Sequence, residues 1–173
     1  MKTTIRTAVT ADASQIARLS LQLGYPTSTE DVRRRLARLK NRKDHRVIVA
    51  THEDRAVAWL HVCRKEPLEI PGYAEISALV VGEAYRGRGI GAELVQKAER
   101  WAKSAGLQKF RVRSNVNRKR TKLFYQNLGF RVTKTQSVFD KTVGRRRTNG
   151  SSGRRLGEKY PDCRRRSSSA LGR

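Results

Sequence analysis

One stretch of the chain, residues 76–102, restricts the possible folds more than any other. It begins with ISALVV at 76–81, an apolar and β-branched run that predicts a strand, and continues through RGRGIG at 86–91. Beyond the glycines, Leu94, Val95 and Ala98 share one helical face. We therefore predict a strand, a glycine-rich turn and a helix, an arrangement typical of proteins that layer helices on a sheet.

The glycine-rich turn has the properties of a phosphate-binding site. A helix N-terminus exposes unpaired backbone N–H groups and the positive end of the helix dipole. Gly87, Gly89 and Gly91 carry no side chains that would block an anion, and Arg86 and Arg88 add positive charge. No Gly-Lys-Ser/Thr follows, and the glycine spacing differs from the dinucleotide-binding pattern. The alternative is that the glycines only allow close packing of helix and strand.

Hydrophobic periodicity predicts a mixed α/β architecture for most of the chain. The expected strands cover 3–9, 46–51, 56–63, 74–81 and 109–113, with a final strand pair or one long bent strand over 130–143. The expected helices cover 13–23, 27–39, 90–106 and 118–128. No internal repeat is present, so the pattern predicts one layered domain.

The basic residues are distributed unevenly along the 173 residues, whose formal net charge is +24. Residues 144–173 contain ten Arg or Lys and two acidic residues, with few apolar side chains and no periodicity. Such a segment buries too little surface to offset the entropy of ordering, so we predict a disordered basic tail there. Residues 1–143 carry the apolar stripes and are expected to form the folded domain, which is itself basic.

Composition also bears on the location of the protein and on its partners. No apolar stretch approaches the roughly 18 residues of a membrane-spanning helix, and the N-terminus lacks the pattern of a secretory signal. Cys63 and Cys163 have neither disulfide nor metal-ligand spacing, which favours a cytoplasmic protein with reduced thiols and no metal. The positive charge suits an anionic partner, either a nucleic acid or a phosphate-bearing small molecule.

Two motifs give the chain a family resemblance. RGRGIG at 86–91 fits the pattern Arg/Gln-x-x-Gly-x-Gly/Ala, and residues 124–130 read FYQNLGF, about 34 residues further on. In these motifs and in the order of its predicted elements, the sequence resembles the GCN5-related N-acetyltransferase (GNAT) superfamily. The resemblance implies a GNAT-like α/β fold over residues 1–143, in which helices flank a central, mostly antiparallel sheet.

The resemblance further implies an enzyme that moves an acetyl group from acetyl-CoA directly to a primary amine, on a small molecule or a protein. The implied cofactor-binding residues are Leu79, Val80, Val81, Arg86, Gly87, Arg88, Gly89, Ile90 and Gly91. The three strand residues would pair through their backbone with the pantetheine arm, and the turn residues would hold the pyrophosphate.

Candidate catalytic residues follow from the same resemblance. Tyr125 occupies the family's usual general-acid position, where a phenol can protonate the departing thiolate; its alternative is a core tyrosine packed beside Phe124 and Phe130. Glu75 is the first candidate for the base, because simple strand alternation predicts that it shares a face with Ser77 and Leu79. The alternative for Glu75 is a strand-end acid that pairs with a surface arginine.

His61, on the neighbouring predicted strand, is the second candidate for the base, and its alternative is a structural histidine. A different hypothesis for the whole protein is a non-catalytic basic module of the same fold that binds RNA, DNA or ribosomes. No RNP motif, zinc-ligand spacing or helix-turn-helix signature accompanies the charge. Many members of the superfamily pair through exposed strands or helices, so the resemblance also allows a homodimer.

Overall fold

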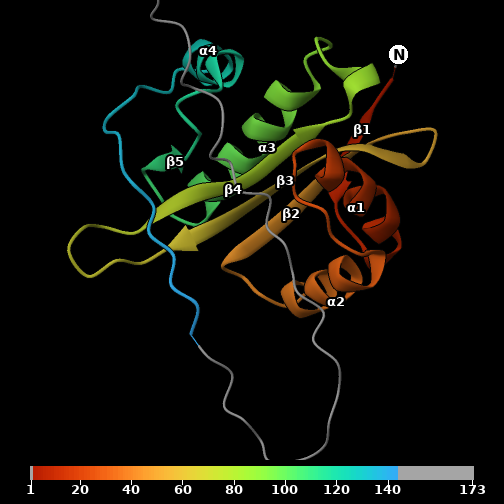
Figure 1. The fold of residues 1–173 in the computed structure, drawn as a ribbon, viewed down its shortest axis with the longest axis horizontal. Coiled ribbons are helices and arrows are strands. Elements are labelled where there is room, and N and C mark those ends of the chain that lie inside the picture. The colour runs from red at the N-terminus through yellow and green to blue at the C-terminus, as the bar shows by residue number, and fades with distance from the viewer. Residues whose placement is uncertain (1, 144–173) are drawn as a thin grey trace, which may run out of the picture. The chain divides into compact units, whose positions relative to one another are not determined.

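The computed structural model describes residues 2–143 and has the mixed α/β architecture expected from the sequence (Figure 1). Its elements are β1 (Thr4–Thr7), η1 (Thr10–Asp12), α1 (Ala13–Gln22), α2 (Thr29–Leu39), β2 (His45–His52), β3 (Arg55–Lys65), β4 (Tyr73–Val81), η2 (Glu83–Tyr85), α3 (Ile90–Ser104), β5 (Phe110–Val112) and α4 (Lys119–Asn127). The strands form one sheet in the order β1-β2-β3-β4-β5. Pairing is antiparallel from β1 to β4, and only β4 and β5 run parallel.

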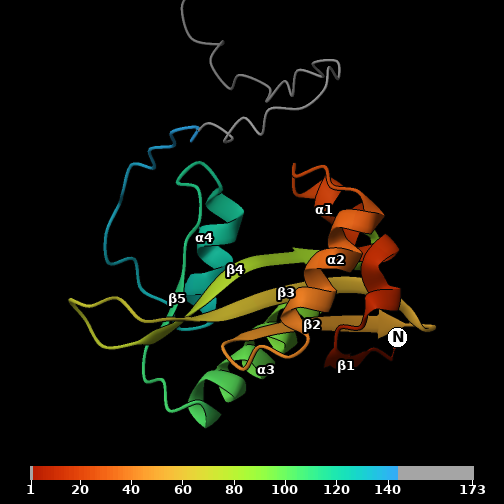
Figure 2. The same ribbon diagram turned by 90° about the horizontal axis from the view of Figure 1, so that it is seen from below.

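Helices cover both faces of this sheet. Figure 2 shows α3 on one side and α1, α2 and α4 on the other. On the α3 side, Leu60 and Val62 of β3 pack with Leu94 and Ala98 of α3 in the larger core cluster. On the other side, the smaller cluster joins α1 and α2 to the sheet, with Trp59 of β3 packed against it. Side chains on the two faces of β3 therefore pack against different helices, because successive side chains of a strand point to opposite faces.

A buried carboxylate fixes the junction between β1 and α1. Asp12 is 4% exposed, and it accepts two hydrogen bonds of 2.7 Å from the Arg6 guanidinium and one of 2.8 Å from the Val9 N–H. Burial raises the pKa of Asp12, but the hydrogen bonds from Arg6 and Val9 outweigh it and hold the pKa below the ordinary 3.8. The side chain thus ties the end of the strand to the start of the helix.

We expect Asp12→Asn to lower the free energy of unfolding by about 1–3 kcal/mol, because Arg6 loses a charged, doubly bonded partner in a buried place. The ionised Asp12 is favoured in the folded state, so its contribution is present above pH 4 and is lost as the pH falls through the folded-state pKa. Urea unfolding at pH 7 and at pH 3 measures both effects. Asp140→Asn, an exposed substitution, is the control. An equal decrease in the free energy of unfolding at both pH values would contradict the conclusion that the ionised Asp12 stabilises the fold.

The predicted strand pair or bent strand over 130–143 is wrong. The structure has no helix or strand from Phe130 to Val143, and Val138 and Phe139 are 80% and 91% exposed. The sequence of this segment is rich in β-branched residues, but propensity yields a strand only where a partner strand and a buried face are present.

The chain consists of a compact unit, Met1–Thr135, and a second unit, Gln136–Arg173. All of the helices and strands given above belong to the first unit. The predicted disordered basic tail over 144–173 lies outside the described residues. The domain boundary at residue 143 therefore stays a prediction.

Candidate active site

The outer half of β4 has one edge open. β4 pairs with β5 only at Ala74, Glu75 and Ile76, and β5 ends at Val112. Within the described chain, residues 77–81 have β3 along one edge and no strand along the other. Unpaired N–H and C=O groups at a strand edge can bind an extended ligand as an additional strand. This edge includes Leu79, one of the residues that the family resemblance implies for cofactor binding.

A β-bulge interrupts β4 at the same point. Along β3, His61 lies opposite Ala78 and the next residue lies opposite Ile76, so Ser77 has no cross-strand partner. A bulge of this kind reverses the alternation of side chains beyond it. Polar groups and backbone amides at such a position are free for use by a ligand, and bulges are frequent next to active sites.

The bulge corrects one expectation about the strand face. Glu75 lies opposite Cys63, and the hydroxyl of Ser77 is 3.3 Å from the Cys63 thiol, so these three share the face on the α1 and α2 side. Leu79 lies opposite Leu60, whose side chain belongs to the core beneath α3. The prediction that Glu75 and Leu79 share a face is therefore wrong, because simple alternation does not account for the inserted residue.

The three glycines of the turn have two different roles. Gly87 and Gly89 have φ angles of +75° and +79°, and a Cβ atom at either would meet no heavy atom within 4 Å. These two residues serve a left-handed backbone that opens onto free space. Gly91 has no such angle, but a Cβ there would lie 3.2 Å from Cζ of Phe124. At Gly91, the absence of a side chain therefore allows close packing between α3 and α4, which is the alternative role considered for the glycines.

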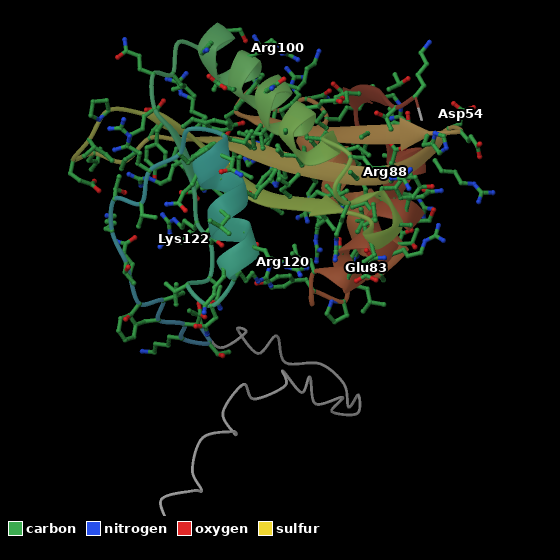
Figure 3. All side chains as sticks on the ribbon, turned by 90° about the horizontal axis from the view of Figure 1, so that it is seen from above. Asp54, Glu83, Arg88, Arg100, Arg120 and Lys122 are labelled. Atoms are coloured by element: carbon green, nitrogen blue, oxygen red, sulfur yellow. The ribbon has the colours of Figure 1, made fainter. Side chains whose placement is uncertain are left out.

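Gly89 is the N-cap of α3 and offers no side-chain acceptor to the first turn. The N–H groups of the first turn, which no intrahelical carbonyl can satisfy, are therefore available to an anion. Arg86 donates to the Val81 carbonyl oxygen at 3.1 Å, and the guanidinium of Arg88 lies 5.9 Å from the ring centre of Tyr85. Figure 3 shows Arg88 and Glu83 at this end of α3.

Basic side chains also project from α4. Arg120 and Lys122 are exposed on this helix (Figure 3), and neither forms an ion pair with a described residue. Positive charge on α4 and in the glycine turn creates a field that favours a polyanionic ligand.

Tyr125 is buried in an aromatic cluster at the base of α4. Its ring centre lies 5.0 Å from that of Phe124 and 5.4 Å from that of Phe130, in edge-on contacts. Burial raises the pKa of Tyr125 to about 12, so the phenol is protonated at neutral pH. No described residue exchanges a hydrogen bond with its hydroxyl group.

Glu75 already has a partner. The residue is 8% exposed, and its carboxylate Oε2 accepts a hydrogen bond of 3.1 Å from Nε of Arg113, just beyond β5. The nearby carboxylate of Glu75 raises the pKa of Arg113, with smaller contributions from Tyr73. This contact matches the alternative considered for Glu75, a strand-end acid paired with an arginine.

His61 lies on the same sheet face as Glu75 and also has a partner that the sequence did not indicate. Nδ1 of His45 and Nε2 of His61 are 3.0 Å apart, and the two rings stack with centres 5.2 Å apart. Burial, with the neighbouring His45 and Lys65, lowers the pKa of His61 to about 4. The imidazole is therefore neutral at physiological pH.

Sequence reasoning missed His45 and Arg113. His45 stands at the start of a strand, and its contact with His61 depends on the antiparallel register between β2 and β3, which the sequence does not specify. Among the described residues, no cluster of three or more His, Cys, Asp or Glu could hold a metal ion. None of the described helices is long and apolar enough to cross a membrane.

Comparison with known proteins places the chain among the acyltransferase enzymes. A model of the "Acetyltransferase (GNAT) family" matches residues 11–130, more than half of the chain. The chain therefore belongs to the GNAT acetyltransferase family, as its two motifs indicated. No curated protein sequence matches it significantly.

Solved structures share the fold at low sequence identity. One is a transcriptional regulator from Bacillus halodurans C-125 (24% identity, TM-score 0.73, 81% of this chain and 100% of that chain covered). Another is glucosamine-6-phosphate N-acetyltransferase from Arabidopsis thaliana (22% identity, TM-score 0.72, 81% and 99% covered). A third is AAC(6')-Iy in complex with the bisubstrate analog CoA-S-monomethyl-acetylneamine (14% identity, TM-score 0.73, 83% and 100% covered).

Proposed function

We propose that this protein transfers an acetyl group directly from acetyl-CoA to a primary amine. The observation that carries the proposal is the continuity between the open edge of β4 and the uncapped N-terminus of α3. The pantetheine arm would pair with residues 79–81, and the pyrophosphate would lie over residues 86–91, the residues that the family resemblance implies. Acetyl-CoA supplies the activated thioester; the chain supplies its position and the groups that move protons.

Tyr125 is assigned as the general acid. In direct transfer, the amine nitrogen attacks the thioester carbonyl carbon, the C–S bond breaks, the thiolate gains a proton and the amine loses one. A phenol that stays protonated at neutral pH can donate that proton to the thiolate. Ser77 has no cross-strand partner at the bulge, and we assign its backbone N–H as the donor to the oxyanion that forms on the carbonyl oxygen.

Of the two candidate bases, His61 fits better than Glu75. His61 is neutral and carries an unshared electron pair at physiological pH, whereas the Glu75 carboxylate is already bonded to Arg113. We assign Glu75 and Arg113 to holding the sheet face on which the amine binds. The basic surface disfavours polycationic amines, because like charges repel, so an amine of low positive charge is the better substrate.

Calorimetric titration of the full chain with acetyl-CoA, at low and at high salt, tests this function. We expect saturable binding that survives the increase in salt, followed by release of free CoA thiol when a panel of primary amines is added. Binding that is non-saturable and disappears steeply with salt would instead support the basic module, because phosphate contacts alone are strongly salt-dependent.

A further inference from the structure

The pair formed by His45 and His61 is a feature that the proposed reaction does not yet use. The two residues lie on adjacent strands and on one sheet face, since His61 pairs across the sheet with Val47 and His45 with Cys63. Both side chains are partly buried, and their ring nitrogens are 3.0 Å apart. On its other side His61 lies opposite Ala78, next to the bulge in β4. The pair thus extends from the bulge in β4 to the first residue of β2.

Asp44 determines which ring nitrogens of this pair carry a proton. Its Oδ2 lies 3.6 Å from Nε2 of His45, so the negative charge favours a proton on that nitrogen. Nδ1 of His45 is then an acceptor, and Nε2 of His61 donates to it. In this arrangement Nδ1 of His61 keeps the unshared electron pair with which it can accept a proton.

We propose that His45 positions His61 as the base and passes the amine's proton from His61 to solvent, beside Asp44; this rests on the proposed acetyl transfer. Nδ1 of His61 accepts one proton from the attacking amine, and Nε2 of His61 releases one to Nδ1 of His45. Nε2 of His45 then releases a proton to water. One proton leaves the amine and one reaches solvent, so no oxidant or metal is required. The two rings finish in the opposite tautomers and return to the starting ones by exchanging ring protons with water before the next turnover.

The charges around the pair favour movement in this direction. At the inner end, burial and the positive charge of Lys65 disfavour a proton on His61. At the outer end, burial also lowers the pKa of His45, together with Arg42 and Lys65, but Asp44 opposes them. The Arg42 guanidinium lowers the pKa of Asp44 to about 2, so Asp44 stays ionised and stabilises the charged imidazole without keeping the proton. Glu75 and Arg113 lie on the same face as a closed ion pair.

The test compares His45→Asn with His52→Asn, a histidine at the opposite end of the same strand. An asparagine can hydrogen-bond His61 but cannot carry a proton. We expect His45→Asn to lower kcat by about tenfold or more, with KM for acetyl-CoA unchanged, and added imidazole to restore part of the rate. His52→Asn should leave kcat unchanged. Unchanged kcat in His45→Asn would overturn the relay, and so would a decrease that imidazole does not reverse.

A second variant and a second measurement keep the relay separate from the acetyl transfer itself. Asp44→Asn, a substitution at a half-buried position, is expected to lower kcat in the same direction by a few fold, because the charged His45 loses its counter-ion. NMR titration of the imidazoles requires no activity: a His61 pKa that rises in His45→Asn supports the contact, and an unchanged pKa contradicts it. If the wild-type protein releases no CoA with any amine, the proposed function fails, whereas this titration still tests the pair.

Discussion

Tyr125→Phe is expected to lower kcat for acetyl transfer by about 10²-fold or more, while the affinity for acetyl-CoA changes little. The substitution removes only the hydroxyl group and keeps the ring contacts with Phe124 and Phe130, so packing is preserved. A thiolate that leaves without a proton donor must be protonated by water, which is slower. Steady-state kinetics with a fixed amine, together with acetyl-CoA titration of the variant, measure the two quantities.

Tyr25→Phe is the matched control for this experiment. Tyr25 is 68% exposed in the loop between α1 and α2, so loss of its hydroxyl should leave kcat unchanged. The high pKa of Tyr125 also predicts that the wild-type rate does not decline from ionisation of this phenol until the pH is above about 11. Full activity of Tyr125→Phe across the pH range would remove the tyrosine from the mechanism and leave it as a core residue.

Gly89→Asp is expected to weaken acetyl-CoA binding by about 10²-fold or more. Aspartate is a favourable N-cap residue, and its carboxylate would accept hydrogen bonds from the first-turn N–H groups of α3 that the pyrophosphate needs. The same negative charge repels the phosphates. A side chain at φ +79° also costs about 1–2 kcal/mol, so the fold is weakened as well.

Two comparisons separate these effects. Gly106→Asp places the same residue at φ +73° at the far end of α3, also in open space, and therefore carries the backbone cost without the local block. Gly89→Asn keeps the shape and removes the charge. Calorimetry should show near wild-type affinity for Gly106→Asp and an intermediate affinity for Gly89→Asn. Equal affinity of all three variants and the wild type would mean that the turn does not bind the cofactor.

Much of the architecture could be predicted from the sequence because local signals are strong where β4, the turn and α3 follow one another. Glycines at positive φ and a regular apolar helical face leave few alternatives there. The prediction of a strand after Phe130 was wrong because β-propensity does not produce a strand where no partner strand is present.

The site was harder to predict than the fold because its contacts join distant segments. Glu75 meets Arg113 through the parallel pairing of β4 with β5, and His45 meets His61 through the antiparallel register of β2 with β3. Neither register is fixed by the local sequence. The bulge at Ser77 is similarly invisible in a pattern of alternating residues, yet it decides which side chains share a face.

That bulge allows one strand to satisfy two demands that regular alternation would place in conflict. On the α3 side, Ile76 and Leu79 keep an unbroken apolar surface although three positions separate them. On the other side, the extra residue leaves a short polar interval around Ser77 in a strand that is otherwise mostly apolar. Without the extra residue, Ala78 and Leu79 would follow Ile76 in ordinary alternation, opposite the same residues of β3, and the polar interval would be lost. The number of residues in β4, as well as their identities, therefore determines which side chains face the candidate active site.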